Sequence, residues 1–189
     1  MGRIVVTEFV SIDGVMEDPG GGESYERGGW AFEVERGEEG DRFKLAELQE
    51  ADAQLLGRVT YEGFAKAWPG MTDDVGFADK MNSMPKYLVS STLKDPSWTN
   101  TTVLDGDVVE EIAKVKREVD GVILVAGSAK LVHTLIEHDL VDELRLMVFP
   151  IVLGHGKRVF ADTSAKKRLR LVDSQVVGDG VVVLTYQPG

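Results

Sequence analysis

The hydrophobic and polar positions along the chain follow two periods, one typical of buried strands and one typical of amphipathic helices. Short runs rich in valine, isoleucine, leucine and threonine, bounded by glycine or polar turn residues, predict strands. These predicted strands are residues 3–12, 53–56, 86–90, 101–104, 122–126, 143–153, 169–177 and 181–187. Apolar residues spaced three and four positions apart predict helices between the strands. The predicted helices are residues 38–51, 60–67, 76–82 and 108–119, and a last one that opens at Gly127-Ser128.

The order of these elements predicts a single α/β domain over residues 1–189. Strands and helices alternate until the last two strands, and parallel strands need such helical crossovers. Only Gly178-Asp179-Gly180 separates the last two strands, which predicts an antiparallel hairpin. We therefore expect a mixed sheet. Pro150, inside the predicted strand 143–153, has no N–H to donate and predicts a sheet edge or a bulge there.

Composition and charge argue against several classes of protein. The 189 residues include no cysteine, which excludes disulfide scaffolds, thiol nucleophiles and thiolate metal sites. The three histidines lack metal-ligand spacing, so we expect no metal. A net charge of -11 repels phosphate backbones, so we expect no nucleic-acid partner. No signal-peptide pattern and no apolar stretch of about 20 residues occurs, so we expect a cytoplasmic protein that binds no membrane.

The strongest candidate for ligand binding is the turn Gly127-Ser128, where a buried strand passes directly into a helix. Glycine lets a ligand approach the backbone closely, and free N–H groups and the helix dipole attract an anion. An ordinary strand-to-helix turn with a serine cap explains the same residues without a ligand. The dinucleotide fingerprint G-x-G-x-x-G fails, because Ala129 and Val132 stand where it needs glycine.

Two other turns follow the same logic. Gly57, Arg58 and Thr60 lie where a strand passes into a helix, and the guanidinium of Arg58 suits a phosphate, unless Arg58 pairs with a surface acid. Ser90-Ser91-Thr92 follows the next strand and offers three hydroxyl groups, or forms a polar turn. In open α/β sheets, ligands bind beyond the carboxyl ends of the strands. Three such turns therefore suit a ligand with separated phosphates, such as a dinucleotide.

Five segments, taken in order, resemble the dihydrofolate reductase superfamily, especially the branch that contains the C-terminal reductase domain of riboflavin-biosynthesis RibD proteins. They are Ser11-Ile-Asp-Gly14, Gly57-Arg-Val-Thr-Tyr-Glu62, Met84-Pro-Lys-Tyr-Leu-Val-Ser-Ser91, Ala126-Gly-Ser128 and Pro150-Ile-Val-Leu-Gly-His-Gly156. The resemblance covers nearly the whole chain. It implies a dihydrofolate reductase-like three-layer α/β fold, with a central, mainly parallel sheet and a C-terminal antiparallel hairpin. It also implies NADPH lying across the strand ends.

The resemblance further implies which residues contact the cofactor and the substrate. The positions that match cofactor contacts are Phe9, Val15, Met16, Gly57, Arg58, Thr60, Ser90, Ser91, Gly127, Ser128, Ala129 and Lys130. Among them, residues 57–60 match a phosphate turn, residues 90–91 match the segment beside the adenosine ribose, and residues 127–130 match the pyrophosphate turn. Gly154 and Gly156 match a segment near the substrate.

Two carboxylates are candidates for the catalytic acid. Asp41 precedes Gly57 by the same spacing as the carboxylate that engages the pterin in dihydrofolate reductases. The alternative interpretation is that Asp41 is a surface acid near a helix N-terminus. Asp13 is the second candidate, and its other interpretation is an ordinary Asp-Gly turn residue.

The leading hypothesis is an NADPH-dependent oxidoreductase that transfers a hydride to a pteridine- or pyrimidine-like heterocycle. The reaction resembles that of dihydrofolate reductase or of 5-amino-6-(5-phosphoribosylamino)uracil reductase. The alternatives are a non-catalytic nucleotide-binding or regulatory module that retains the cofactor site, and a purely structural domain. We also expect a homodimer, because riboflavin-type reductases commonly pair and because the last strands suggest open sheet edges. The glycine-rich residues 18–24 predict a mobile loop beside the nicotinamide.

Overall fold

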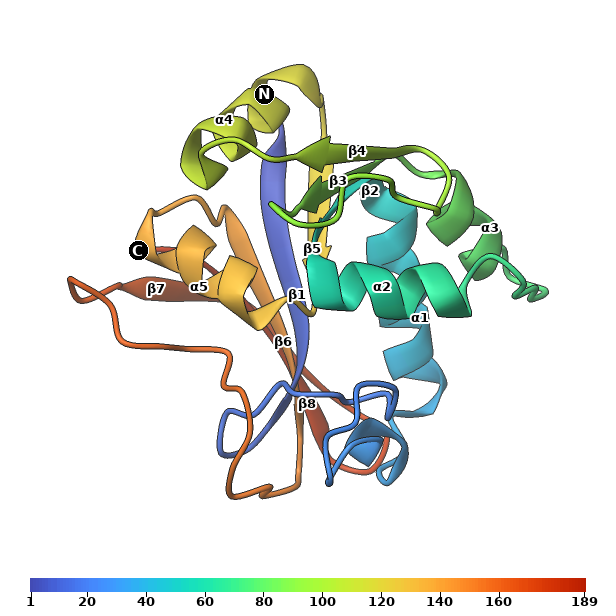
Figure 1. Cartoon of the computed structure of the whole chain (residues 1–189). Coiled ribbons are helices and arrows are strands. Elements are labelled where there is room, and N and C mark those ends of the chain that lie inside the picture. Colours follow the sequence, from blue (N-terminus) through green and yellow to red (C-terminus); the bar gives the residue numbers. More distant parts are fainter.

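A computed structural model describes residues 1–189 and contains one eight-stranded sheet in the order β4-β3-β2-β5-β1-β6-β8-β7 (Figure 1). The strands are β1 (Arg3–Ser11), β2 (Ala51–Gly57), β3 (Lys86–Val89), β4 (Thr101–Leu104), β5 (Val122–Ala126), β6 (Glu143–Phe149), β7 (Leu169–Val177) and β8 (Val181–Pro188). The first six strands run parallel, and β8 is antiparallel to both β6 and β7. The predicted mixed, mainly parallel sheet with a C-terminal hairpin is confirmed.

Helices on both faces of this sheet make the three layers. They are the 3-10 helix η1 (Trp30–Phe32), α1 (Gly37–Glu50), α2 (Arg58–Ala67), α3 (Phe77–Ser83), α4 (Val108–Glu118) and α5 (Ala129–Glu137). In Figure 1, α4 and α5 lie on one side of the sheet and α1, α2 and α3 lie on the other. The predicted three-layer fold is confirmed. None of the helices has the length and apolar character needed to cross a membrane.

The centre of the sheet is apolar on both faces, as expected for parallel strands that are covered by helices. In β1, Ile4 and Val6 pack toward α4 and α5, whereas Val5 packs toward α1, α2 and α3. All three side chains are fully buried. A third cluster lies under the C-terminal hairpin, where Trp30 meets Phe149 edge to face at 5.5 Å between ring centroids. These clusters fix β1 and its neighbours, whose carboxyl ends form the candidate site.

The strand predicted over residues 143–153 is shorter than expected. Strand β6 ends at Phe149, and Pro150 follows it. Because β6 lies between β1 and β8, Pro150 marks neither a sheet edge nor a bulge, and that prediction was wrong. The physical reason is that β6 pairs on both sides, so pairing ends where proline has no N–H to donate. Beyond Pro150 the chain runs beside the segment that follows β1, where Val15 and Arg158 form an isolated bridge.

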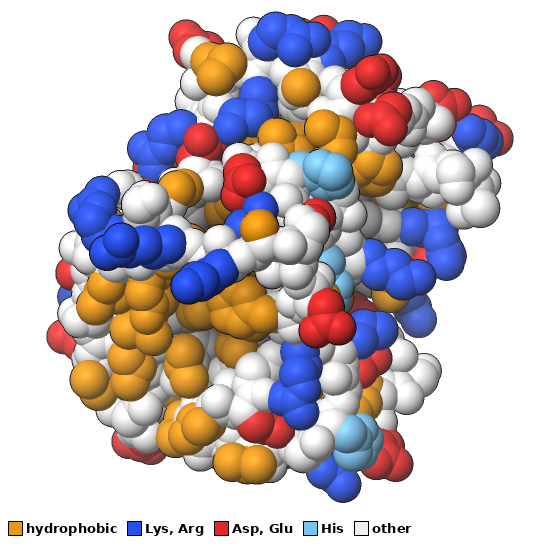
Figure 2. All heavy atoms as spheres, turned by 90° about the vertical axis from the view of Figure 1, so that its left-hand side faces the viewer, with side chains coloured by type: hydrophobic (Ala, Val, Ile, Leu, Met, Phe, Trp, Pro, Cys, Tyr) orange, Lys and Arg blue, Asp and Glu red, His pale blue; other side chains and the backbone are white.

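Strand β7 leaves one edge of the sheet open and carries exposed apolar side chains. Alternate residues of the hairpin share one face, and we call the apolar ones the hairpin patch. The hairpin patch consists of Leu169, Leu171 and Val176 of β7 with Val182, Leu184 and Tyr186 of β8. Figure 2, seen from the α5 side of Figure 1, shows a broad gathering of hydrophobic side chains beside lysines and arginines. An open edge with such a face invites pairing with another chain.

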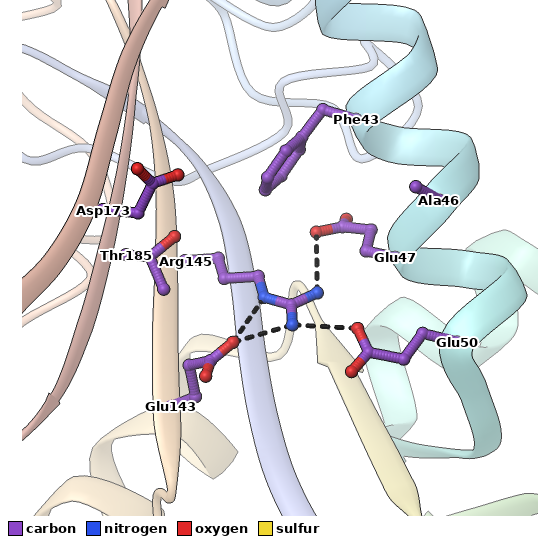
Figure 3. Close-up of a pocket in the computed structure, with 8 residues that line it drawn as sticks. All are labelled: Phe43, Ala46, Glu47, Glu50, Glu143, Arg145, Asp173 and Thr185. Carbon is purple, nitrogen blue, oxygen red and sulfur yellow. Dashed lines mark hydrogen bonds and ion pairs between the residues drawn. The ribbon is translucent and has the colours of Figure 1, made fainter.

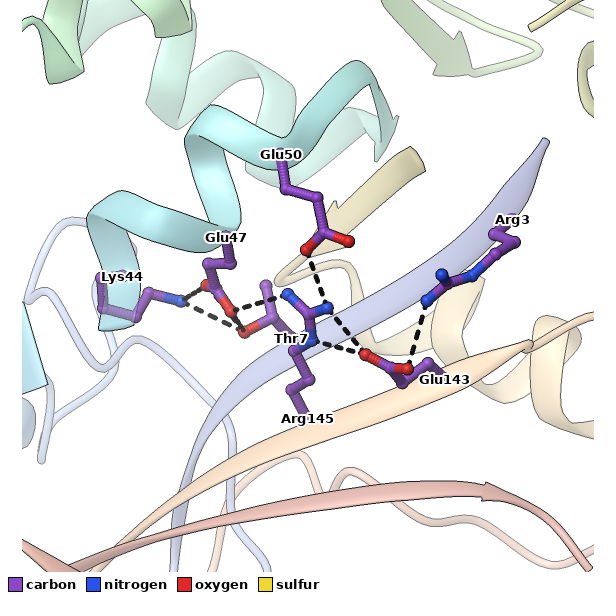
Figure 4. A network of polar contacts seen from close by, with 7 residues as sticks. All are labelled: Arg3, Thr7, Lys44, Glu47, Glu50, Glu143 and Arg145. Atoms are coloured by element: carbon purple, nitrogen blue, oxygen red, sulfur yellow. Dashed lines mark hydrogen bonds and ion pairs between the residues drawn. The ribbon is translucent and has the colours of Figure 1, made fainter. Parts of the chain in front are cut away.

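An ion-pair network connects α1 to β6 and supplies most of the charged side chains that line a neighbouring pocket. The guanidinium of Arg145 lies 2.9 Å from Glu50 and 2.7 Å from Glu143 (Figure 4). Buried Glu47 accepts a 2.9 Å hydrogen bond from Thr7 Oγ1. A pocket of about 310 Å³ lies between α1 and the last strands, lined by Phe43, Ala46, Glu47, Glu50, Glu143, Arg145, Asp173 and Thr185 (Figure 3). Because the central charges are paired with one another, we read this pocket as structural.

Lys86, the first residue of β3, is a buried lysine whose ammonium group is bonded to backbone carbonyl groups. Its Nζ donates to the carbonyls of Asn82 at 2.9 Å, Met84 at 2.8 Å and Thr99 at 3.2 Å. It also lies 4.2 Å from the ring centroid of Trp98. The residue is 1% exposed, and burial lowers its pKa to about 8.

We expect Lys86 to contribute a rise in the free energy of unfolding between about pH 8 and about pH 10.5. In that range the unfolded chain, where the lysine pKa is near 10.5, binds more protons than the folded protein. The substitution Lys86→Met should flatten this rise, whereas Lys66→Met, on the exposed side of α2, should keep it. Urea unfolding across this range measures the effect. The same rise in the Lys86→Met protein would contradict the prediction.

Candidate cofactor-binding site

Three turns lie at one edge of the sheet because β3, β2 and β5 are parallel neighbours. Gly57 and Arg58 follow β2, Ser90 and Ser91 follow β3, and Gly127-Ser128 follows β5. The sheet order reverses here, since the chain runs outward from β2 to β4 and then returns to β5 between β2 and β1. In open α/β sheets, such a switch point is where ligands bind. The structure therefore brings the three predicted turns to a single edge.

Two of these turns are joined by hydrogen bonds. The Oγ of Ser128 accepts a 2.9 Å hydrogen bond from the backbone N–H of Gly57. In return, the Oγ1 of Thr60 accepts a 2.8 Å hydrogen bond from the backbone N–H of Ser128. Gly127 has φ +64°, and a Cβ on it would lie 2.7 Å from Thr60 Oγ1. The close approach of the two turns therefore requires glycine at position 127.

Ser128 is the N-cap of α5 but does not cap it with its side chain. Its φ of +64° lies in the left-handed region, and its hydroxyl bonds Gly57 instead of the first turn of α5. The first N–H groups of a helix have no partner within the helix. The backbone N–H groups of Ala129 and Lys130, in the first turn, therefore face the edge without a side-chain cap. This arrangement suits an anion.

The polar side chains of the other two turns are engaged within the protein. Both oxygens of Glu62 lie 3.1 Å from Nη1 of Arg58, whose side chain is 47% exposed. The Oγ of buried Ser90 accepts hydrogen bonds from the backbone N–H groups of Thr92 and Leu93, and Ser91 is exposed. Arg58 therefore pairs with a surface acid, Glu62, as its alternative interpretation expects. An exposed ion pair of this kind is weak enough for a ligand to replace it.

The end of β1 supplies the remaining predicted cofactor contacts. Val15 and Met16 are buried, and Val15 N–H donates to Ser11 Oγ at 2.9 Å. Phe9 is half-buried, with the guanidinium of Arg36 5.3 Å and the ammonium of Lys44 4.9 Å from its ring centroid. An aromatic face with two cations beside it lies on the α1 side of the sheet.

Asp13 holds the loop that follows β6. Its carboxylate accepts hydrogen bonds from the backbone N–H groups of Leu153 at 3.1 Å and Gly154 at 2.7 Å, and from Ser11 Oγ at 2.6 Å. The bond from Ser11, with those from the backbone, lowers the pKa of Asp13 to about 2. Asp13 is therefore ionised at neutral pH. Gly156, with φ +123°, packs closely against Val15, so the loop that carries both predicted substrate glycines lies against the segment that follows β1.

Asp41 lies apart from these groups. It is exposed on the first turns of α1, and its Oδ1 lies 2.6 Å from Nε of Arg36. The structure therefore places the turns at 57–58, 90–91 and 127–128 at one edge of the sheet, joins Asp13 and Val15 to the loop that carries Gly154 and Gly156, and leaves Asp41 at the surface. Their roles in binding and catalysis stay predictions.

Sequence reasoning missed one acid at this edge, Glu8 of β1. The residue is 4% exposed, and its Oε2 accepts a 3.0 Å hydrogen bond from the backbone N–H of Gly127. Burial raises the pKa of Glu8 well above its ordinary value. The available signal was a carboxylate between Ile4-Val5-Val6 and Val10 in a strand otherwise expected to be buried.

These features define an α/β protein with a candidate phosphate-binding edge at the switch point of its sheet. The family model of the RibD C-terminal domain matches residues 3–183. The chain belongs to the RibD C-terminal domain family. Two proteins of Bacillus subtilis (strain 168), both uncharacterized, are similar in sequence. YyaP is 30% identical over 142 residues, which are 74% of this chain and 75% of YyaP. YwjB is 28% identical over 179 residues, which are 95% of this chain and 94% of YwjB.

Solved structures share the fold at lower sequence identity. A protein from Shewanella sp. PV-4 has a TM-score of 0.78 at 22% identity and covers 99% of both chains. The Thermotoga maritima diaminohydroxyphosphoribosylaminopyrimidine deaminase/5-amino-6-(5-phosphoribosylamino)uracil reductase has a TM-score of 0.66 at 19% identity, over 100% of this chain and 57% of that one. Enterococcus faecalis dihydrofolate reductase, complexed with NADP(H), has a TM-score of 0.58 at 15% identity, over 99% and 96%. The predicted superfamily resemblance is confirmed.

The linked turns predict a specific cost for a side chain at position 127. The substitution Gly127→Ala should destabilise the protein by about 1–2 kcal/mol more than Gly180→Ala. Both glycines have positive φ, but a Cβ at Gly180 meets open space, whereas a Cβ at Gly127 meets Thr60 Oγ1. Urea unfolding of both variants measures the difference. Equal losses would contradict the close contact between the two turns.

Proposed function

We propose that this protein is an NADPH-dependent reductase that transfers a hydride to a pteridine- or pyrimidine-like heterocycle. The observation that carries the proposal is the pair of turns at residues 57–60 and 127–128, which hydrogen bonds join at the switch point of the sheet. Family membership supports the same class of reaction. So do the names of two structural neighbours, a uracil-type reductase and a dihydrofolate reductase complexed with NADP(H).

The chain offers separate groups for the separate parts of such a cofactor. The N–H groups of Ala129 and Lys130 suit the pyrophosphate, because they open α5 without a side-chain cap. Arg58 and Ser91, exposed on the two neighbouring turns, suit the phosphate on the adenosine ribose. Val15 and Met16 offer an apolar boundary for the nicotinamide and exclude water from it.

In the proposed reaction the protein positions the hydride acceptor and supplies the electrostatic environment, while bound NADPH supplies the hydride. Gly154 and Gly156 lie on the loop that Asp13 bonds to β1, so this loop is suited to hold the heterocycle. A carboxylate with a pKa of about 2 carries no proton at neutral pH. Asp13 therefore fits a positioning role, and the proton reaches the substrate from another acid or a bound water.

Consumption of NADPH across a panel of dihydropteridines and aminouracils tests the proposal. We expect the loss of NADPH absorbance to depend on the heterocycle that is added. If NADPH raises the melting temperature but no heterocycle is reduced, the non-catalytic nucleotide-binding module is favoured. That alternative has one supporting observation, since both Asp13 and Asp41 are already bonded elsewhere. No change in melting temperature would contradict both proposals.

The substitution Arg58→Ala should weaken NADPH binding by about ten- to a hundredfold and change NADH binding little. A charge-assisted bond to the ribose phosphate contributes about 1.5–3 kcal/mol, and only NADPH carries that phosphate. Fluorescence titration with each cofactor measures the two affinities. Arg42→Ala is the matched control, because Arg42 is another exposed arginine of a helix, paired with Glu38 four residues away. Equal losses for both cofactors would instead assign Arg58 to the pyrophosphate, and no loss would make it a surface arginine.

We also propose that two copies of the chain form a homodimer through the hairpin patch. Strand β7 is an uncovered edge, and the apolar face beside it extends over both strands of the hairpin. A two-fold pairing buries the same patch on both copies, which is how most soluble dimers are built.

Sedimentation at micromolar concentration should therefore show a dimer, and Val176→Asp should convert it to a monomer. Val75→Asp provides the matched control, because Val75 is 60% exposed and Val176 is 66% exposed, but only Val176 lies in the hairpin patch. A buried aspartate without a partner is costly, which gives the direction of the effect. A wild-type monomer, or equal effects of both substitutions, would contradict this interface.

A further inference from the structure

Glu8 has a buried carboxyl oxygen without a hydrogen-bond partner. Its Oε1 is the only buried side-chain nitrogen or oxygen in the chain that lacks one. Glu8 follows Thr7, whose pairing with Ala126 is the last between β1 and β5, and its Oε2 reaches the N–H of Gly127 just beyond β5. The carboxyl group therefore lies on the turn that opens α5. Buried polar groups are almost always bonded, so this exception calls for a physical reason.

No cation forms an ion pair with the carboxyl group of Glu8. The charged groups that act on it are Lys44 and Glu47 of α1 and Glu23 of the glycine-rich loop, which are one cation and two anions. Lys44 is already bonded to Glu47 and Thr7 on the other face of the sheet (Figure 4). An ionised carboxylate that is buried without its own cation is strongly disfavoured. Burial accordingly raises the pKa of Glu8, and the single bond from Gly127 only partly opposes that rise.

The same turn is the proposed site of the cofactor phosphates. Gly127 N–H is used by Glu8, and the next free N–H groups, those of Ala129 and Lys130, are two and three residues further along. A carboxylate and a phosphate on one turn repel each other, and the repulsion is strong where water is excluded. A neutral carboxylic acid avoids the repulsion and still accepts the Gly127 bond through Oε2.

We propose that binding of a phosphate-bearing dinucleotide at this turn takes up one proton at Glu8, so that the bound protein contains the neutral carboxylic acid. The inference rests on the proposed function, because it requires the cofactor phosphates at residues 127–130. Glu8 is a positioning residue in this scheme. It holds the turn in both protonation states and makes cofactor affinity depend on pH.

The linkage between proton and cofactor fixes the sign of the pH effect. At a pH below the pKa of Glu8 in the free protein, the proton is already present and the affinity for NADPH is constant. Above that pKa, the Kd rises by up to about tenfold per pH unit, because each binding event must first take up a proton. The substitution Glu8→Gln keeps an oxygen that accepts from Gly127 and carries no charge, so it should remove this dependence.

Calorimetric titration with NADPH tests the proposal when it is repeated in buffers of different ionisation enthalpy, from about pH 6 to about pH 9. Wild-type protein should take up close to one proton in the range where the Kd rises. Glu8→Gln should take up none and should bind NADPH more tightly than wild type at the upper pH. Glu118→Gln is the matched control, because Glu118 is an exposed glutamate at the end of α4, outside the candidate site, and this variant should behave like wild type.

The outcomes separate this coupling from the function on which it rests. If wild type and Glu8→Gln bind NADPH with the same proton uptake, or if wild type takes up none, the coupling is overturned and the cofactor site stands. If neither protein binds NADPH, the proposed function is overturned together with the coupling. Infrared difference spectra of wild-type protein, labelled with carbon-13 at the glutamate carboxyls, give an answer even if the variant does not fold. NADPH should increase the carboxylic acid band above the pKa of Glu8, and no increase would overturn the coupling.

Discussion

The hydrogen bonds at Ser128 are the constraint on which the candidate site depends. One bond fixes Gly57 and the other fixes Thr60, so the turns after two neighbouring parallel strands become one rigid unit. The hydroxyl that would ordinarily cap α5 is used for this link, which leaves the start of the helix open to an anion. Position 127 must then be glycine, because any Cβ would separate Ser128 from Thr60. Ser128 therefore makes a tertiary contact with Gly57 in place of the local helix cap that its residue type favours.

The chain has a net charge of -11, but several acids around the candidate site are bonded within the protein or buried. Asp13 is surrounded by N–H donors, and Glu17 bonds Lys157, whose hydrogen bond lowers the pKa of Glu17. Glu62 lies against Arg58, and burial disfavours the charge of Glu8. For a phosphate the local arrangement of charges matters, and these contacts engage acids that the overall composition counts as free charges.

The fold could be predicted from the sequence because short stretches of the chain determine its strands, helices and turns. Apolar runs such as residues 122–126 and the turn Gly178-Asp179-Gly180 specify strands and a hairpin with little help from distant residues. The three turns could be predicted for the same reason. The contacts of Glu8 with Gly127 and of Asp13 with Gly154 could not, because they join residues that only the folded sheet brings together. The end of β6 before Pro150 depended on whether that strand has neighbours on both sides, which is also a property of the whole sheet.

The contacts behind the site make two loops act as one. Asp13 and Glu17, both in the segment that follows β1, accept hydrogen bonds from the backbone of residues 153, 154 and 157. His155 lies 2.7 Å from Glu26, and the Tyr25 hydroxyl donates to the carbonyl of His155 at 2.6 Å. The glycine-rich segment between Asp18 and Glu23 is therefore anchored, at both of its ends, to the loop that carries Gly154 and Gly156. Movement of either end of this segment must stretch or break bonds to the loop that carries Gly154 and Gly156. A shift of either end of the glycine-rich segment is thereby coupled to the position of the 154–156 loop.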